Sequence, residues 1–296
     1  MTHPGMARPA GLATRHRRLA GCLQGWLVAA LALTIGLLGA ARSQDEVPFI
    51  TTPDPVTLAM LQLAGVTADD VVIDLGSGDG RIVITAAKRF GARGLGVDID
   101  PALVARSRDN ARAAGVADRA VFRVQDLFQT ELSAAQVITL YLLPEFNLQL
   151  RPRLLALAPG TRIVSHDWDM GEWPADRRIT LDVPEKAIGR DKRSTVHLWV
   201  VPAQVQGLWC TAGASLVITQ RFQAFSATLS VAGAVAPLLV FDGRVAADHL
   251  HAGTDAQAAL ITLRQVGDRL QWLRSTEPGR RFEGRRFERA GPQGCH

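Results

Sequence analysis

The chain has 296 residues, of which 47% are hydrophobic, 21% charged and 6% aromatic. These fractions are ordinary for a globular protein, and they exclude a disordered chain, a collagen-like repeat and a protein with many membrane spans. The formal net charge of +5 comes from the N-terminus, because residues 1–43 contain five arginines and no acidic residue. The rest of the chain carries 28 basic and 28 acidic side chains, so its charge is not that of a nucleic-acid-binding protein.

An uncharged run over residues 19–41 follows the arginines at positions 15, 17 and 18. A basic flank, an apolar core and small residues after it are typical of a secretory signal peptide. The run is also long enough to cross a bilayer as an uncleaved anchor. We therefore expect residues 1–43 to be a signal peptide or a membrane anchor, with a misassigned start codon as the third interpretation. The leader predicts a membrane-associated or exported, periplasmic protein; the alternative is the cytoplasmic face of the inner membrane.

Strand and helix patterns alternate after a proline-containing entry at residues 44–55. Helices are predicted over residues 55–64, 81–89, 101–114 and 144–157, and strands over residues 71–75, 94–97, 121–124, 137–142, 162–165, 179–183 and 196–201. Pro152 should break or kink the last of these helices. Alternating units of this kind predict an α/β, Rossmann-like, doubly wound sheet, in which ligands bind beyond the carboxyl ends of the strands. We assign residues 44–203 to this domain.

Residues 204–296 have a different character, with little helical periodicity and many glycines. Short strands are predicted over residues 215–220, 227–231, 238–241 and 260–263, which indicates a small antiparallel β module of unknown role. The basic tail at 280–289 is interpreted as a solvated last strand rather than a patch for nucleic acid or lipid headgroups. Cys210 and Cys295 can pair in an oxidising compartment, although two unrelated cysteines are the favoured interpretation.

Three glycines, Gly76, Gly78 and Gly80, lie in the turn between the first strand of the sheet and its helix. Glycines there allow positive φ and let a ligand approach the backbone, next to the free N–H groups of a helix start. Dinucleotide-binding turns are also glycine-rich, but Arg81 stands where that fingerprint needs its third small residue. Asp74 lies inside the strand just before the turn, where a carboxylate suits an ammonium group rather than a pyrophosphate.

Two further aspartates follow neighbouring strands. Asp98 ends the second strand, where an acidic side chain can accept both hydroxyls of a ribose. Asp126 follows the third strand and can accept from an adenine amino group, with Leu127 or Phe128 against the ring. A single aspartate at a strand end is usually an N-cap or turn residue. Three of them around a glycine turn favour S-adenosylmethionine (SAM) as the cofactor.

Several short blocks carry a family resemblance: Pro48-Phe49 with Thr51, DLGSGDGRIVI at 74–84, GVDIDP at 96–101 and DLF at 126–128, with weaker matches at 140–147 and 165–173. Through them residues 47–173 resemble a class I, seven-strand SAM-dependent methyltransferase domain. More narrowly, they resemble the lysine methyltransferases that act on the c subunit of mitochondrial ATP synthase and on the adenine nucleotide translocase, with their bacterial relatives. The resemblance covers under half of the chain.

The resemblance implies roles for the matching residues. It implies that the methionine end is held at the glycine turn by Asp74, Gly76, Ser77, Gly78 and Gly80. It implies that Asp98 holds the ribose and that Asp126 and Leu127 face the adenine. It also implies that the 48–52 segment, with Phe49 and Thr51, folds over the cofactor near the substrate entrance.

Residues after the fourth and fifth strands are the candidates for the acceptor side. A carboxylate or imidazole can orient an amine and take its proton, so we expect catalytic roles for Tyr141, Glu145, His166 and Asp167. Trp168 and Trp173 are interpreted as packing residues. The mitochondrial members have a glycine-containing turn after the fourth strand, where this chain has Tyr141-Leu142-Leu143-Pro144, which leaves the acceptor open. The Asp/Asn-Pro-Pro-aromatic pattern of nucleic-acid amino-methyltransferases is absent at this place.

The first functional hypothesis is a protein-lysine N-methyltransferase that acts on a membrane-associated protein. The alternative is a methyltransferase for a lipid, quinone or other small molecule, and the third hypothesis is a non-catalytic exported binding protein. The expected partners are the methyl acceptor and a membrane contacted through the N-terminus, with no nucleic acid and no metal. SAM is made in the cytoplasm, whereas the leader predicts that the domain is exported. The sequence does not explain how an exported domain would meet SAM.

Overall fold

The computed structural model describes residues 50–187, 191–253 and 261–295. The predicted leader at 1–43 and the predicted cofactor residue Phe49 lie outside these ranges. Within them, no helix combines the length and the apolar character needed to cross a membrane.

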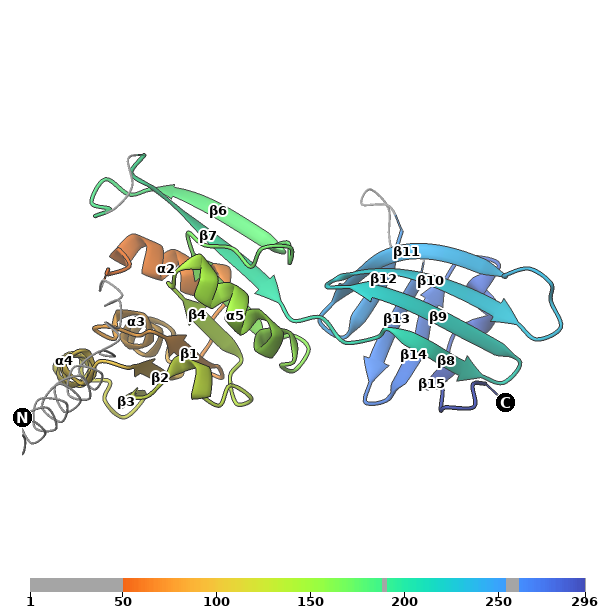
Figure 1. The fold of residues 1–296 in the computed structure, drawn as a ribbon, viewed down its shortest axis with the longest axis horizontal. Helices are drawn as coiled ribbons and strands as arrows, with labels where there is room; N and C mark the ends of the chain where they lie inside the picture. The colour runs from red at the N-terminus through yellow and green to blue at the C-terminus, as the bar shows by residue number, and fades with distance from the viewer. Residues whose placement is uncertain (1–49, 188–190, 254–260, 296) are drawn as a thin grey trace, which may run out of the picture. The chain divides into compact units, whose positions relative to one another are not determined.

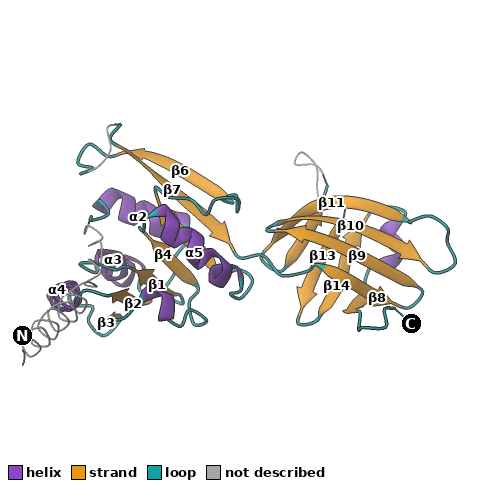
Figure 2. Ribbon diagram, viewed as in Figure 1, coloured by secondary structure: helices purple, strands orange, loops and turns teal. Residues whose placement is uncertain are grey.

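A seven-stranded sheet in the order β3-β2-β1-β4-β5-β7-β6 forms the first part of the described chain (Figures 1 and 2). Its strands are β1 Val71–Leu75, β2 Arg93–Asp98, β3 Ala120–Val124, β4 Val137–Leu140, β5 Arg162–His166, β6 Arg177–Asp182 and β7 Arg193–Val200. Strands β1 to β5 pair in parallel, and β7 runs antiparallel to both of its neighbours. The predicted Rossmann-like methyltransferase sheet is therefore present as a mixed sheet.

The helices of this part are α2 Asp54–Leu63, α3 Arg81–Phe90, α4 Pro101–Ala113 and α5 Pro144–Leu155, with a short 3₁₀ helix, η1, at Leu127–Gln129. The predicted N-cap of α4 is confirmed, because Asp100 Oδ1 accepts from the Ala102 N–H at 2.7 Å. Of the predicted break or kink at Pro152, the break is wrong, since α5 continues to Leu155, and the kink stays a prediction. The backbone carbonyl four residues earlier belongs to Leu148, which is exposed, so water can satisfy the bond that proline cannot form.

Apolar side chains cover both faces of the sheet. Val72 of β1 packs with Met60 of α2 and Ala86 of α3, whereas the next residue, Ile73, packs with Leu150 of α5. Successive side chains of a strand point to opposite faces, so a strand buried on both sides needs a continuous apolar run. Asp74 interrupts such a run and is buried with it.

The C-terminal part is a closed antiparallel barrel in the order β10-β11-β12-β13-β14-β15-β8-β9. Its strands are β8 Gly207–Thr211, β9 Ala214–Arg221, β10 Ala224–Val231, β11 Leu239–Ala246, β12 His249–Ala252, β13 Ile261–Val266, β14 Arg269–Ser275 and β15 Arg286–Arg289. Large buried side chains, including Trp209, Phe225, Trp272 and Phe287, form its core. The predicted antiparallel module is thus confirmed, but it has more strands than predicted and no open edge.

The end of the chain closes the barrel. Strand β15 lies between β14 and β8, with Glu288 opposite Cys210. The following residues bring Cys295 to Cys210, and the two form a disulfide with their Cα atoms 5.5 Å apart. The favoured interpretation of two unrelated cysteines is therefore wrong, because barrel closure joins segments 85 residues apart. The basic tail ends in the expected last strand, preceded by a 3₁₀ helix, η2, at Gly279–Phe282.

Candidate cofactor and acceptor site

The glycine turn lies at the carboxyl edge of the sheet, between β1 and α3. Gly76, Gly78 and Gly80 have φ values of +77°, +53° and +82°. The N–H groups of Gly76 and Ser77 both donate to the Val97 carbonyl at 2.9 Å, which ties the turn to β2. A Cβ atom on Gly80 would lie 2.6 Å from the Phe122 ring, so this position needs glycine for space as well as for its left-handed backbone.

Asp98 lies where β2 ends and is oriented by the turn itself. Its Oδ2 accepts from the Gly78 N–H at 2.8 Å, and its Oδ1 accepts from the Asp100 N–H at 3.0 Å. A carboxylate has about four acceptor positions, so both oxygens can still accept from a pair of hydroxyls. The fixed carboxylate beside the glycine turn is therefore suited to the predicted ribose contact.

Asp74 is the buried charge of this site, with 2% of its surface exposed. It accepts from the Thr139 hydroxyl at 2.7 Å. Burial, with help from Asp98 and Asp79 and against the Thr139 bond, raises the pKa of Asp74 to about 7. The Oγ of Ser77, also buried, has no hydrogen-bond partner among the described residues. A buried carboxyl group whose charged form an ammonium group would favour, with an unsatisfied hydroxyl three residues along the chain, fits the amino-acid end of SAM.

Arg81 joins the entry segment to the glycine turn. Its Nη1 donates to the Thr52 carbonyl at 2.7 Å, and its Nη2 binds Asp79 at 2.7 Å. Burial opposes ionisation of Asp79, but the hydrogen bonds and charge of Arg81 prevail and lower the pKa of Asp79. Thr52 is buried and Thr51 is exposed beside it. The sequence marked Arg81 only as a mismatch with the dinucleotide fingerprint, and its role in holding the entry segment was missed.

Asp126 serves as the N-cap of η1. Its Oδ1 accepts from the Phe128 N–H at 2.8 Å, and its Oδ2 accepts from Gln129 at 3.3 Å. Leu127 is partly buried against the core of the sheet. The carboxylate keeps further acceptor positions toward solvent, so the adenine contact stays a prediction.

Tyr141 directly follows β4 and stacks on His166, with ring centroids 3.9 Å apart. His166 is fully buried, and its Nε2 lies 2.9 Å from the Ser194 hydroxyl. Burial lowers the pKa of His166 to about 4, so the imidazole is neutral at neutral pH. Burial and the charge of Asp167 raise the pKa of Tyr141, which keeps the phenol protonated. Tyr141 is half-buried and His166 lies against its ring.

The other two predicted acceptor-side residues differ in their surroundings. Asp167 Oδ1 accepts from the Thr195 N–H at 2.9 Å, and its Oδ2 binds Lys186 Nζ at 2.8 Å. The Asp167 carboxylate is thus bound by Thr195 of β7 and by Lys186 of the loop between β6 and β7. Glu145, in the first turn of α5, is exposed. Tyr141 and Glu145 therefore reach the surface, whereas His166 is buried against the Tyr141 ring.

Asn147 is a site residue that sequence reasoning did not select. It is buried in α5, and its Nδ2 lies 3.2 Å from the carbonyls of both Trp168 and Asp169. Its Oδ1 has no hydrogen-bond partner within the described ranges. The only signal in the sequence was a polar residue in the helix that follows β4.

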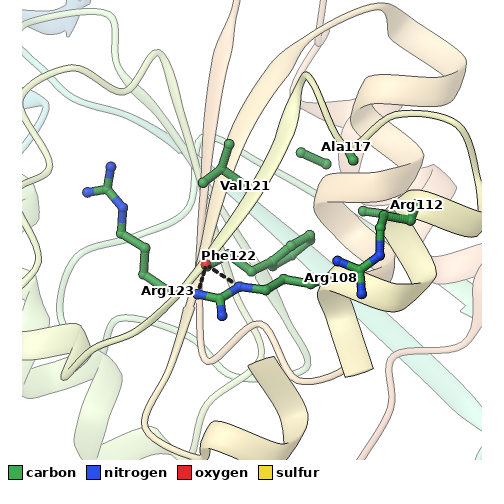
Figure 3. A pocket seen from close by; sticks show the side chains of 8 residues that line it. Arg108, Arg112, Ala117, Val121, Phe122 and Arg123 are labelled. Carbon is green, nitrogen blue, oxygen red and sulfur yellow. Dashed lines mark hydrogen bonds between the residues drawn. The ribbon is translucent and has the colours of Figure 1, made fainter. Parts of the chain in front are cut away.

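A pocket at the outer edge of the sheet contains none of the predicted site residues (Figure 3). It is formed by α4 and β3, with Arg108, Arg112 and Arg123 around an apolar floor. Arg108 donates to the Phe122 carbonyl through Nε at 3.1 Å and Nη2 at 2.8 Å. These bonds occupy a backbone carbonyl of the edge strand and so reduce its capacity to pair. In the part of the chain that the structure describes, no group of three or more His, Cys, Asp or Glu could hold a metal.

Known proteins resemble the sheet domain. Residues 74–177 match the family model described as the ANTKMT methyltransferase domain. A protein-lysine N-methyltransferase of Saccharolobus islandicus (strain REY15A) is 38% identical over 158 residues, which are 53% of this chain and 94% of that protein. The human lysine N-methyltransferase named for the c subunit of ATP synthase is 30% identical over 53% of this chain and 67% of its own. A crystal structure of an RNA methyltransferase from Salinibacter ruber with S-adenosyl-L-homocysteine is 52% identical, covers 53% of this chain and 96% of its own, and has a TM-score of 0.48.

These matches fall on the domain that carries the glycine turn and its aspartates, and together they define a SAM-dependent methyltransferase, an enzyme of one-carbon transfer. Because the chain covers nearly all of a relative at 38% identity, the family is established. The chain belongs to the methyltransferases with an ANTKMT methyltransferase domain. The predicted enzyme class and cofactor are thereby confirmed, and the alternative of a non-catalytic binding protein is wrong.

Proposed function

We propose that this enzyme is a protein-lysine N-methyltransferase that acts on a membrane-associated protein. The observation that carries the proposal is its 38% identity to a protein-lysine N-methyltransferase over 94% of that protein's length. Relatives from Xenopus laevis and human, named for lysine methylation of the ATP synthase c subunit, support a protein acceptor as well. A target in or at the membrane is supported by the predicted leader.

The site residues can position both reactants. When bound, SAM supplies an already activated methyl group, so holding the acceptor in line provides much of the rate. Asp74 would hold the methionine end of SAM and Asp98 its ribose, at the carboxyl ends of β1 and β2. The acceptor amine must lose a proton before its lone pair forms the new N–C bond as the C–S bond breaks. Glu145, exposed at the start of α5, is the carboxylate we assign to take that proton.

Tyr141 has a different role in this scheme. Its pKa is raised, so at neutral pH the phenol is protonated and can donate a hydrogen bond but cannot act as a base. Its ring is held in place by His166, which is itself held by Ser194. We assign Tyr141 to orient the acceptor.

We also propose that the body of the enzyme lies outside the cytoplasm, either exported or held at the membrane by an anchor; the cytoplasmic face is the alternative. The leader pattern supports this, as does the Cys210–Cys295 disulfide, because disulfides persist in oxidising compartments. Thiols trapped by acid quenching and alkylation of whole cells test the placement. Oxidised Cys210 and Cys295 agree with export, whereas two free thiols place the body on the cytoplasmic face.

The acceptor is tested with the full chain, methyl-labelled SAM and an extract from a strain that lacks the gene. The extract is separated into protein, RNA, lipid and small molecules after reaction. We expect label in protein, methyllysine in its digest, and loss of both with Asp98→Asn. Asp109→Asn, at an exposed position of α4, is the matched control and should retain activity. Label in RNA, lipid or a small molecule would contradict a lysine acceptor.

A further inference from the structure

Trp168 is the exposed tryptophan of the described chain. The residue lies just after β5 at the carboxyl edge of the sheet, and it is 42% exposed. The other described tryptophans, Trp173, Trp199, Trp209 and Trp272, are at most 1% exposed. The packing role expected from the sequence is therefore right for Trp173 and wrong for Trp168. Trp168 is therefore a large exposed aromatic residue at the edge of the sheet where ligands bind.

The backbone that carries Trp168 is strained. The Trp168 N–H donates to the His166 carbonyl at 2.8 Å, a bond between residues two apart that defines a γ-turn. Its central residue, Asp167, has a φ of +63°. This left-handed form of the turn is rare for a residue with a side chain, and such strain persists only where the surroundings enforce it.

Strand β7 and the loop between β6 and β7 hold the turn from one side. The Asp167 N–H donates to the Thr195 carbonyl at 2.6 Å, and the Thr195 N–H donates back to Asp167 Oδ1 at 2.9 Å. Lys186 holds the second carboxylate oxygen at 2.8 Å. Three contacts thus fix the single strained residue.

Helix α5 holds the same segment from the other side. Asn147 donates to the Trp168 carbonyl at 3.2 Å, and Arg151 donates to the Met170 carbonyl at 2.9 Å. Gly171, with a φ of +62°, lets the segment approach α5, because a Cβ there would lie 2.8 Å from Leu148. The backbone beside Trp168 is therefore fixed on both sides, so little order has to be gained when its ring binds a ligand.

We propose that Trp168 is a specificity-determining residue of the acceptor side, whose indole binds the alkyl stem and ammonium group of the acceptor lysine. This proposal rests on the proposed lysine specificity. The indole is the best aromatic partner for an ammonium group, and its face also covers an alkyl chain. Asp169, exposed and next along the chain, adds a carboxylate to the same turn. Tyr141 directly follows the neighbouring strand β4, so Trp168 lies at the same edge of the sheet as the residue assigned to orient the amine.

The kinetic test compares Trp168→Phe and Trp168→Ala with the wild-type chain on the labelled protein acceptor. We expect Trp168→Ala to raise KM for the acceptor by about 2- to 30-fold, the range of one cation–π contact, with a smaller change in kcat. Trp168→Phe should recover part of the loss. The Kd for SAM should stay unchanged in both variants, which a misfolded site would not allow. Val124→Ala, an exposed apolar position on β3, is the control and should behave as wild type.

A direct binding test uses the full chain labelled with 5-fluorotryptophan, with the Trp168 resonance assigned from Trp168→Phe. N-acetyl-lysine methylamide is titrated in the presence of S-adenosyl-L-homocysteine, and N-acetyl-norleucine methylamide serves as the uncharged control. We expect the Trp168 signal to move with the lysine probe and less with the norleucine probe. A signal that ignores both probes, or an unchanged KM in Trp168→Ala while wild type still makes methyllysine, overturns this inference alone. Absence of methyllysine from wild type overturns the proposed function and this inference with it.

Discussion

Replacing Asp74 with asparagine should stabilise the free enzyme while it weakens cofactor binding. Asp74 is buried, and its pKa of about 7 in the folded protein is well above the ordinary carboxyl pKa of about 3.9. The folded state therefore holds a proton that the unfolded state has already lost, so stability is greatest at low pH and falls as pH rises from about 4 to about 7. Asparagine can still accept from the Thr139 hydroxyl but carries no charge.

The expected magnitude follows from the two pKa values. Burying Asp74 costs about 1.5 kcal/mol at pH 5, where folding must protonate the carboxyl, and about 4 kcal/mol at pH 8, where the buried carboxyl is mostly charged, so Asp74→Asn should gain these amounts. Amide hydrogen exchange in urea, read on peptides from β1 and β4, reports the sheet domain alone. Asp109→Asn serves as the control for loss of an exposed charge. A stability gain that is equal at both pH values, or a loss at pH 8, would refute the reasoning.

SAM binding should change the protonation of Asp74. An ammonium group beside Asp74 favours its charged form, so SAM binding at pH 6 should release close to one proton. Calorimetry in two buffers with different ionisation enthalpies measures this number, and Asp74→Asn should abolish the release. Wild-type binding without proton release at pH 6 would place the ammonium group elsewhere.

Three further changes test other parts of the molecule. Asp98→Asn should raise the Kd for SAM by about 10- to 100-fold in calorimetry, because hydrogen bonds to a charged acceptor are lost; an unchanged Kd would contradict the ribose contact. Gly80→Ala should destabilise the sheet domain by about 1–3 kcal/mol in the exchange assay, because the new methyl group meets Phe122 and the backbone is left-handed; no loss would mean that the turn can move. The double change Cys210→Ser and Cys295→Ser should cost the barrel about 2–4 kcal/mol in urea denaturation, and equal stability with and without reductant in wild type would argue against the bond in solution.

The cofactor side of the site could be predicted because its signals are local. A glycine turn flanked by Asp74 and Asp98 is a pattern of residue types at fixed places in a βαβ unit, and the structure brings these residues together at one edge. Asp126 shows the limit of such patterns. Its position at a strand end was correct, yet its visible partners are those of an N-cap.

The acceptor side could not be predicted because its partners come from far along the chain. Asp167 is held by Lys186 and Thr195, which lie on the β6–β7 hairpin, and no spacing in the sequence relates them. The exposure of Trp168 depends on a left-handed γ-turn at a residue with a side chain, which has no sequence signature. The same holds for the disulfide, since Cys295 lies beside Cys210 only because β15 pairs with β8 in the barrel.

The barrel is completed by its last strand. Strand β15 pairs with β14 on one side and with β8 on the other, and it is the last of the described barrel strands in chain order. During synthesis, β8 therefore leaves the ribosome well before β15, and the backbone groups that pair with β15 stay unpaired until then. A truncation before Arg286 would remove β15 and leave the edges of β8 and β14 permanently unpaired. Loss of β15 should thus cause aggregation of the protein rather than a local defect in the barrel.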